Sequence, residues 1–340
     1  MKKHANIPIF IPHVGCPNTC VFCNQRTISG VKDFHPEQVR AIIEESLKTI
    51  DKSVEAEIAF FGGSFTGIDR ELMTELLEIA NEYLKCGRVS SVRCSTRPDY
   101  IDPEILDILC AYGVGTVELG LQSTSDIVLN ASKRGHSFED EKRACQLIRE
   151  RGIELVGQMM IGLPDSTPES EEETARFIIE SGAVGARIYP TVVLRDTELC
   201  QMSMRGDYTP LETEDAVARS ASVFRMFIKN GLKVIRIGLC ASENLSSDKT
   251  YFAGPNHPAL GDMVLGRYFY NEIIEHSKHI DTESGTILSV SVSPISLSRA
   301  LGQKKINKRL ITERLKIRDT LFLTDDNLSE YEVSVTTTGG

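Results

Sequence analysis

Strand-like and helix-like segments alternate from residue 7 to residue 239, and this alternation limits the fold more than any other feature. The strand-like segments are short apolar runs at residues 7–12, 56–61, 91–96, 115–122, 154–161 and 186–194. Stretches with apolar residues at helical spacing lie between them. This order is typical of a parallel sheet built from strand-helix units. Six units in about 230 residues predict an α/β fold, a partial parallel (β/α)6 TIM-like barrel.

The predicted helices have recognisable first turns. Pro36 precedes an apolar stripe, and the pairs Asp102-Pro103 and Thr167-Pro168 each place a capping side chain before a proline. Proline is tolerated there because its missing N–H would have no partner within the helix. These signals predict helices that begin at the three prolines.

The residues after about 240 differ in character from the alternating region. We therefore divide the chain into a barrel core, residues 1–240, and a C-terminal accessory region, residues 241–340. A strand-like run at residues 234–239 leads into this region, and runs at residues 286–292 and 319–323 indicate strands that flank a helical segment. They predict a small α+β appendage packed on the barrel, with a frayed tail at residues 336–340.

Charge and cysteine content exclude several classes of protein. Lysine and arginine total 38 against 48 acidic residues, a formal net charge of −10, so the surface as a whole repels nucleic acid and anionic lipid. No apolar run approaches the roughly 18 residues that cross a bilayer, and the N-terminus does not resemble a secretory signal. The 9 cysteines are therefore expected to be reduced thiols in a cytoplasmic protein.

Three cysteines, Cys16, Cys20 and Cys23, cluster in the loop after the first predicted strand. With three and then two residues between them, their thiolates can reach three corners of one [4Fe-4S] cluster and leave the fourth iron without a protein ligand. An open iron is a place for chemistry. Zinc is the alternative metal, and His13 or Cys94 could supply the fourth ligand that a closed zinc site needs.

With Phe22 before the last cysteine, this segment resembles the motif of radical S-adenosylmethionine (SAM) enzymes. The resemblance covers most of residues 7–239 and is strongest to the radical SAM part of Elongator subunit 3 and to anaerobic coproporphyrinogen oxidases. It implies that the three cysteines are the metal ligands and the catalytic centre. It also implies that the amine and carboxylate of SAM occupy the open iron.

The same resemblance assigns SAM contacts near the ends of the later strands. It implies a glycine motif beside the amine, polar groups at the ribose, a guanidinium at the carboxylate, and fifth and sixth strands at the adenine. The residues concerned are Gly62, Gly63, Ser64, Ser95, Thr96, Gln122, Arg134, Gly162, Ile188 and Tyr189. Ser95 stands where the Elongator segment has glutamate, so its hydroxyl can meet a ribose but cannot accept from the amine as a carboxylate would.

The implied activity is reductive cleavage of SAM to methionine and a 5′-deoxyadenosyl radical that abstracts hydrogen from a substrate, with a flavodoxin- or ferredoxin-type electron donor. Elongator-type relatives modify the wobble uridine of tRNA with the help of an acetyltransferase domain, which nothing after residue 240 resembles. A local basic run, Lys304, Lys305, Lys308 and Arg309, could contact the phosphates of tRNA.

Other functions stay open at this point. Among enzymes, the alternative is a porphyrinogen-type oxidative decarboxylase. A second class is an iron-sulfur electron carrier that never cleaves SAM, and a third is a zinc-stabilised RNA-binding protein. His136 follows Arg134 within a segment close to the family pattern, and His257 lies in a proline-rich turn where it either faces substrate or closes the turn.

Overall fold

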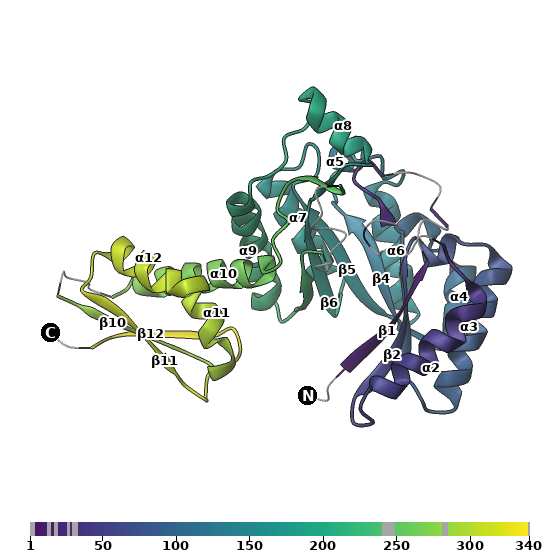
Figure 1. Cartoon of the computed structure of the whole chain (residues 1–340), viewed down its shortest axis with the longest axis horizontal. Coiled ribbons are helices and arrows are strands. Elements are labelled where there is room, and N and C mark those ends of the chain that lie inside the picture. Colours follow the sequence, from purple (N-terminus) through teal and green to yellow (C-terminus); the bar gives the residue numbers. More distant parts are fainter. Residues whose placement is uncertain are drawn as a thin grey trace.

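The computed structural model describes residues 4–11, 15–16, 20–25, 28, 33–239, 249–280 and 285–338. Two lobes are visible in Figure 1. The larger α/β lobe contains the N-terminus, and the smaller lobe contains the C-terminus. Helix α10 (Leu260–Ser277) runs between them and packs on α9 (Thr213–Lys229) of the larger lobe.

Seven parallel strands form the sheet of the larger lobe, in the order β1-β2-β3-β4-β5-β6-β8. Their bounds are β1 (His4–Ile11), β2 (Glu55–Gly62), β3 (Ser91–Thr96), β4 (Val114–Gln122), β5 (Glu154–Ile161), β6 (Gly185–Pro190) and β8 (Lys233–Ile237). The predicted fold class, a partial parallel barrel, is confirmed. The sheet has one strand more than the six predicted units, because β8 returns to pair with β6.

Helices pack on the outer face of this sheet. They are α2 (Val39–Thr49), α3 (Arg70–Lys85), α4 (Pro103–Ala111), α6 (Phe138–Glu150), α7 (Pro168–Glu180) and α9. The short helices α5 (Asp126–Ala131) and α8 (Glu198–Arg205) lie instead beyond one end of the sheet (Figure 1). The Asp102 carboxylate accepts the N–H of Ile105, and Thr167 forms a reciprocal capping box with Ser170, so the predicted starts of α4 and α7 are confirmed. At Pro36 a 3-10 turn (Pro36–Gln38) leads into α2.

The two faces of the sheet differ in character. Ile7, Ile9 and Ile11 of β1 are buried beneath α2, and the corresponding residues of the other strands join the same hydrophobic core. The alternate residues point to the inner, concave face, because side chains alternate along a strand. Charged and polar side chains interrupt that inner face, which makes it unlike the packed interior of a closed barrel.

The sixth predicted run, residues 186–194, divides into two strands. β6 ends at Pro190, and the following β7 (Val193–Leu194) pairs with β9 (Tyr251–Ala253) in a separate antiparallel ladder. Helix α8 follows, with Thr197 as its capping residue. Among the described residues, no helix combines the length and the apolar character needed to cross a membrane.

The smaller lobe contains a three-stranded sheet with β10 (Ile287–Val292) at its centre. β11 (Asp319–Thr324) runs parallel to β10, while β12 (Val333–Thr338) runs antiparallel to it. The predicted strands of this region are confirmed, but the prediction of a frayed tail is wrong for residues 336–338, which pair with β10. Helices α10, α11 (Leu297–Leu301) and α12 (Ile306–Leu315) accompany the sheet.

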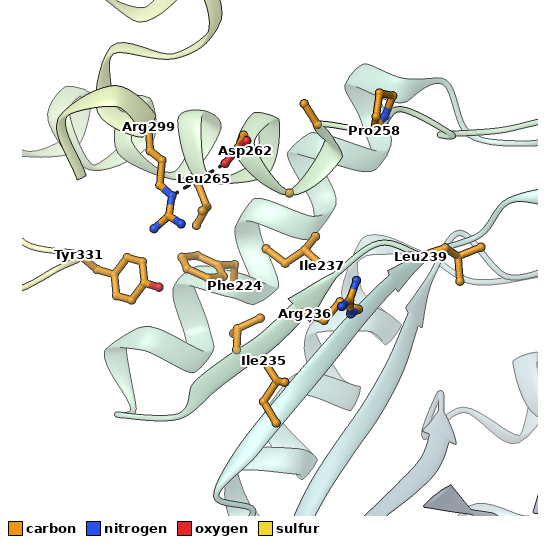
Figure 2. Close-up of a pocket in the computed structure, with 13 residues that line it drawn as sticks. Phe224, Ile235, Arg236, Ile237, Leu239, Pro258, Asp262, Leu265, Arg299 and Tyr331 are labelled. Atoms are coloured by element: carbon orange, nitrogen blue, oxygen red, sulfur yellow. Dashed lines mark ion pairs between the residues drawn. The ribbon is translucent and has the colours of Figure 1, made fainter. Parts of the chain in front are cut away.

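Phe224 of α9 joins the two lobes. Its ring makes edge contacts with the rings of Tyr268 and Tyr331, at centroid distances of 5.2 and 5.3 Å. Beside this contact a pocket of about 340 Å³ opens between β8, α10 and Tyr331 (Figure 2). Arg299 and Asp262 line it and form a long ion pair of 3.8 Å. The lobes therefore share one hydrophobic core and border an open pocket at their seam.

Candidate cofactor site at the mouth of the barrel

The predicted site residues lie at one end of the larger lobe, because the sheet is parallel. Gly62, Thr96 and Gln122 are the last residues of β2, β3 and β4, and Gly162 directly follows β5. The cysteine loop follows β1 at the same edge. We call this end the mouth; it is where parallel barrels place their functional residues.

Three close backbone contacts fix the described residues of the cysteine loop. Gly15 has φ = +82°, and a Cβ added there would lie 2.4 Å from the carbonyl oxygen of Ser64 in the loop after β2. Further on, the N–H of Val21 donates to the Ser132 carbonyl at 3.2 Å, and the N–H of Leu199 donates to the Val21 carbonyl at 2.8 Å. The loop therefore lies between the end of α5 and the start of α8.

The three thiols of the loop occupy different environments. Cys20 is buried, whereas Cys16 and Cys23 are half-buried by side-chain exposure. Burial raises the pKa of Cys16 and raises that of Cys23 to about 12, and the neighbouring thiols add to both shifts. Among the described residues, no three cysteine, histidine or carboxylate side chains are gathered as a ready-made site for a single metal ion. Phe22 packs beside Val21 against β7 and α8.

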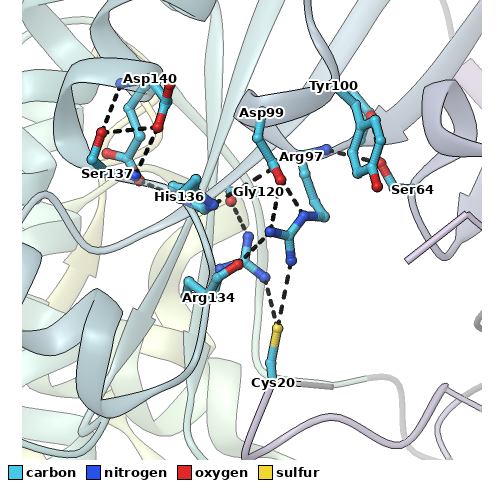
Figure 3. A network of polar contacts seen from close by, with 12 residues as sticks. Cys20, Ser64, Arg97, Asp99, Tyr100, Gly120, Arg134, His136, Ser137 and Asp140 are labelled. Carbon is cyan, nitrogen blue, oxygen red and sulfur yellow. Dashed lines mark hydrogen bonds and ion pairs between the residues drawn. The ribbon is translucent and has the colours of Figure 1, made fainter. Parts of the chain in front are cut away.

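Two buried guanidinium groups point at the sulfur of Cys20 (Figure 3). Arg134 donates from Nη1 to Cys20 Sγ at 3.2 Å and from Nη2 to the Gly120 carbonyl at 2.5 Å. Arg97 directs its Nη1 at the same sulfur from 3.9 Å. We call Arg97 and Arg134 the mouth pair.

The sequence predicts Arg134 but not Arg97 as a site residue, although an arginine two residues before Asp99 at a strand end is a usable signal.

Two polar atoms at the mouth are buried without a hydrogen-bond partner among the described residues. They are Gln122 Oε1 and Arg134 Nε. Gln122 also has φ = +74°, a backbone conformation that non-glycine residues rarely adopt. Buried polar groups without partners cost free energy, and strained residues concentrate at ligand sites. These two side chains are therefore candidates for contact with a ligand.

The hydroxyls of the neighbouring loops bond to one another. Thr96 Oγ1 lies 2.8 Å from Ser64 Oγ and 2.6 Å from Thr66 Oγ1, and the N–H of Arg97 donates to Ser64 Oγ. The N–H of Gly63 donates to the Ile11 carbonyl at 2.8 Å. These contacts join the strand ends of β1, β2 and β3, so Ser64 and Thr96 have a structural role whatever they bind.

The adenine-side residues are placed differently from one another. Gly162 has φ = +76°; its N–H donates to the Glu171 carboxylate at 2.8 Å, and its carbonyl accepts from the Tyr208 hydroxyl at 2.6 Å. Ile188 lies inside the sheet, and its carbonyl accepts the N–H of Gly238 at 2.9 Å. Tyr189 is half-buried on the inner face, where burial raises the pKa of its hydroxyl.

A charged network lies below the mouth on the inner face. Glu118 accepts from Arg93 at 2.8 Å, from Arg187 at 2.7 Å and from Gln158 at 2.9 Å. Arg93 also donates to Glu57 at 2.5 Å. We call these five residues the inner-face network. Ser95 faces it, since Gln158 Nε2 lies 3.4 Å from Ser95 Oγ, and is thus turned away from Thr96. The sequence signal was a charge inside each of several strands that were otherwise apolar.

Other predicted residues lie away from the three thiols or outside the described residues. His136 is buried and bonds Glu141 at 3.0 Å, and burial lowers its pKa to about 3. His257 is exposed and accepts the N–H of Ala259, so it closes the turn before α10. Cys94 lies in the hydrophobic core, and His13, the other alternative zinc ligand, lies outside the described residues.

Comparison with known sequences assigns the family. The profile of the Radical SAM superfamily matches residues 10–178, and that of the Radical_SAM C-terminal domain matches residues 183–268. The chain belongs to the radical SAM superfamily of enzymes. The second match shows that the radical SAM sequence pattern continues past β6 and through β8 into α10.

Relatives of this radical SAM chain include a tRNA uridine(34) acetyltransferase from Methanocaldococcus jannaschii. The two are 30% identical over 200 residues, which cover 53% of this chain and 37% of the relative. The chain therefore spans less than two fifths of the length of that protein.

Solved structures support the same radical SAM fold. Archaeal Elp3 from Methanocaldococcus infernus matches with a TM-score of 0.63 and 22% identity, over 80% of this chain and 68% of that one. Coproporphyrinogen III oxidase from Escherichia coli matches with a TM-score of 0.51 and 17% identity, over 68% of this chain and 53% of the other. At these identities the likeness concerns the fold.

Proposed function

We propose that this radical SAM enzyme holds a [4Fe-4S] cluster on Cys16, Cys20 and Cys23 and binds SAM at the mouth. The observation that carries the proposal is the convergence of two buried guanidiniums on a thiol of the motif, beside polar groups that are buried without partners. Thiolates are the usual ligands of such a cluster, and an arginine fork matches a carboxylate. The residues present thus fit both cofactors.

Cys16, Cys20 and Cys23 would hold the cluster, which when bound would supply the electron for reductive cleavage of SAM and so for hydrogen abstraction from the substrate. Arg134 Nε would donate to the carboxylate of SAM, since this atom is buried and has no partner among the described residues. Gln122 Oε1 would accept from a ribose hydroxyl for the same reason. Gly162 would lie on the adenine side, where the Leu211 side chain occupies the space that a Cβ of residue 162 would take, at 2.5 Å from Leu211 Cδ1.

The electron comes from a flavodoxin- or ferredoxin-type donor in this proposal. The substrate would lie against the inner-face network, below the mouth. The network's own charges are paired across the strands, so it forms a rigid wall that keeps its shape when substrate enters. Half-buried Tyr189 and Gln158 leave polar groups on that wall.

The direct test is an assay for 5′-deoxyadenosine. The protein is reconstituted with iron and sulfide under anaerobic conditions, reduced with dithionite and incubated with SAM. We expect about four irons per chain and release of 5′-deoxyadenosine, both lost when Cys16, Cys20 and Cys23 are replaced by alanine. The matched control replaces Cys86 and Cys110, two exposed cysteines outside the motif, and should retain both. Colourless protein with one zinc, or a cluster that never cleaves SAM, would contradict the proposal.

We further propose that the substrate is a tRNA. One relative is named as a tRNA uridine(34) acetyltransferase, and the smaller lobe carries the basic run around α12. Lys304, Lys305 and Arg309 are exposed, whereas Lys308 is partly neutralised by Asp319 at 3.0 Å. Exposed cations in a local group can bind phosphates although the whole chain is acidic.

RNA retention tests this part of the proposal. Replacement of Lys304, Lys305 and Arg309 by glutamate should weaken retention of tRNA at low salt without changing 5′-deoxyadenosine release. The matched control changes Lys48, Lys52 and Lys85, three residues on the larger lobe, to glutamate, which alters the net charge equally. Equal retention by both variants and the wild type would remove tRNA as the substrate.

A further inference from the structure

Arg97 is buried, and its guanidinium makes more contacts than a surface ion pair does. Its side chain is 5% exposed, and its Nε and Nη2 donate to the Asp99 carboxylate at 2.9 and 3.0 Å. Nη2 also donates to the backbone carbonyl of Arg134, and Nη1 faces Cys20 Sγ (Figure 3). One guanidinium therefore joins the end of β3, the loop after α5 and the cysteine loop.

The charges around Arg97 do not cancel. The mouth pair supplies two positive charges, and Asp99 supplies one negative charge. His136 lies 3.8 Å from Asp99 and adds none at neutral pH, because burial lowers its pKa to about 3. A surplus buried positive charge is costly unless an anion meets it. Both members of the mouth pair direct an N–H at Cys20, so the surplus faces this sulfur.

Cationic N–H donors at the sulfurs of an iron-sulfur centre favour the reduced form, because reduction adds negative charge to it. On the basis of the proposed cluster, we propose that Arg97 is a positioning residue that orients Arg134 through its backbone carbonyl and raises the reduction potential of the cluster through Cys20. Its contacts differ from those of Arg134, whose unpartnered Nε is left for SAM. The two arginines of the mouth pair thus have different contacts: Arg97 would contact the cluster through Cys20, and Arg134 would contact both the cluster and SAM.

The fork of arginine is needed for these three contacts. A planar guanidinium can donate to Asp99 on one edge and to a carbonyl and a sulfur on the others, which a lysine ammonium cannot do in one fixed orientation. Lysine at residue 97 would keep the charge and lose the orientation. The two contributions of Arg97, charge and geometry, can therefore be separated by substitution.

The experiment measures the midpoint potential of the reconstituted cluster by an EPR-monitored redox titration, with iron and sulfide content determined on the same samples. Arg97→Gln should shift the potential to a more negative value at unchanged iron content, and Arg97→Lys should shift it less. Asp99→Asn removes a negative charge and should shift it to a more positive value. The matched control is Arg225→Gln on α9, which breaks a pair with Glu272 outside the mouth and should leave the potential unchanged.

Shifts of the midpoint potential in opposite directions for Arg97→Gln and Asp99→Asn would show an effect of charge. A mere loosening of the local structure would shift both in the same direction, since both variants break the same ion pair. Shifts in the same direction, or an unchanged potential in Arg97→Gln, would overturn the inference. If Arg97→Gln takes up no iron, Asp99→Asn decides: a potential above the wild type supports the inference, and one at or below it overturns it. Failure of the wild type itself to load a cluster would instead overturn the proposed function.

Discussion

The mouth pair and the inner-face network each contain two arginines that are largely shielded from solvent, yet they are balanced differently. In the network, Glu57 and Glu118 match Arg93 and Arg187 charge for charge. At the mouth, Asp99 is the single carboxylate bonded to the pair among the described residues, and the other donors meet backbone oxygens and a sulfur. The network is therefore balanced in charge as folded, whereas the mouth has a positive surplus suited to an anionic ligand.

Glu118→Gln should produce the largest stability change in this comparison. The variant leaves Arg93 and Arg187 without the carboxylate they share, and an uncompensated buried charge costs about 3–5 kcal/mol. Denaturant-induced unfolding measures this loss. The matched control is Glu104→Gln, whose exposed carboxylate lies 3.6 Å from Arg70 and should contribute about 0–1 kcal/mol. A loss below about 1 kcal/mol for Glu118→Gln would show that the network is not a closed unit.

Arg134→Gln should weaken ligand binding more than it lowers stability, the reverse of Glu118→Gln. A hydrogen bond to a charged group contributes about 1.5–3 kcal/mol, so we expect the affinity for SAM to fall about 10- to 150-fold. Stability should fall less than in Glu118→Gln, because this substitution removes part of a charge surplus. Equilibrium binding of SAM to reconstituted protein and unfolding of the same sample check both statements. Wild-type affinity in the variant would separate Arg134 from the SAM site.

The pH dependence of stability should report the lowered pKa of His136, which lies near Asp99 of the mouth. Its pKa in the folded chain, about 3, is below the roughly 6.5 of an unfolded histidine, so the unfolded chain takes up the proton first. The contribution of His136 to stability is therefore lost as pH falls below about 6.5, at a slope of up to about 1.4 kcal/mol per pH unit.

His136→Asn should flatten that slope between about pH 4 and pH 6, measured by urea unfolding at several pH values. The same substitution at His35, which is 53% exposed, serves as the control and should follow the wild type. An unchanged slope in His136→Asn would mean that other titratable groups cause the loss of stability at low pH.

Local signals predicted the fold well because helix starts are short-range features. The caps at Asp102 and Thr167 act over three residues, so the sequence contains both donor and acceptor. β8 and β12 depend on partners far along the chain: Arg187 pairs with Arg236, and Val290 pairs with Val335. Nothing near either strand encodes those distances, so the sequence predicts a strand at residues 234–239 without its pairing to β6, and it does not predict the paired tail.

The candidate site divides in the same way. The cysteine motif is contiguous, and its placement after the first strand follows from the alternation of strands and helices. The role we infer for Arg97 depends on its contacts with Cys20 and Arg134, which are separated from it by 77 and 37 residues. The charges of the inner-face network likewise meet across strands. Sequence spacing therefore nominates candidate ligands, but it does not predict which distant side chains lie beside them.

The smallest expected effect concerns an ion pair that spans the cysteine loop at the surface. Lys133, after α5, lies 2.6 Å from Glu198 at the start of α8, shorter than most contacts of the inner-face network. The two side chains are 58% and 39% exposed, so water screens the pair. A double-mutant cycle with alanine should give a coupling of about 0.2–1 kcal/mol that decreases with salt. A coupling above about 2 kcal/mol would mean that distance rather than burial sets the strength of these pairs, and the contrast between surface and inner face would fail.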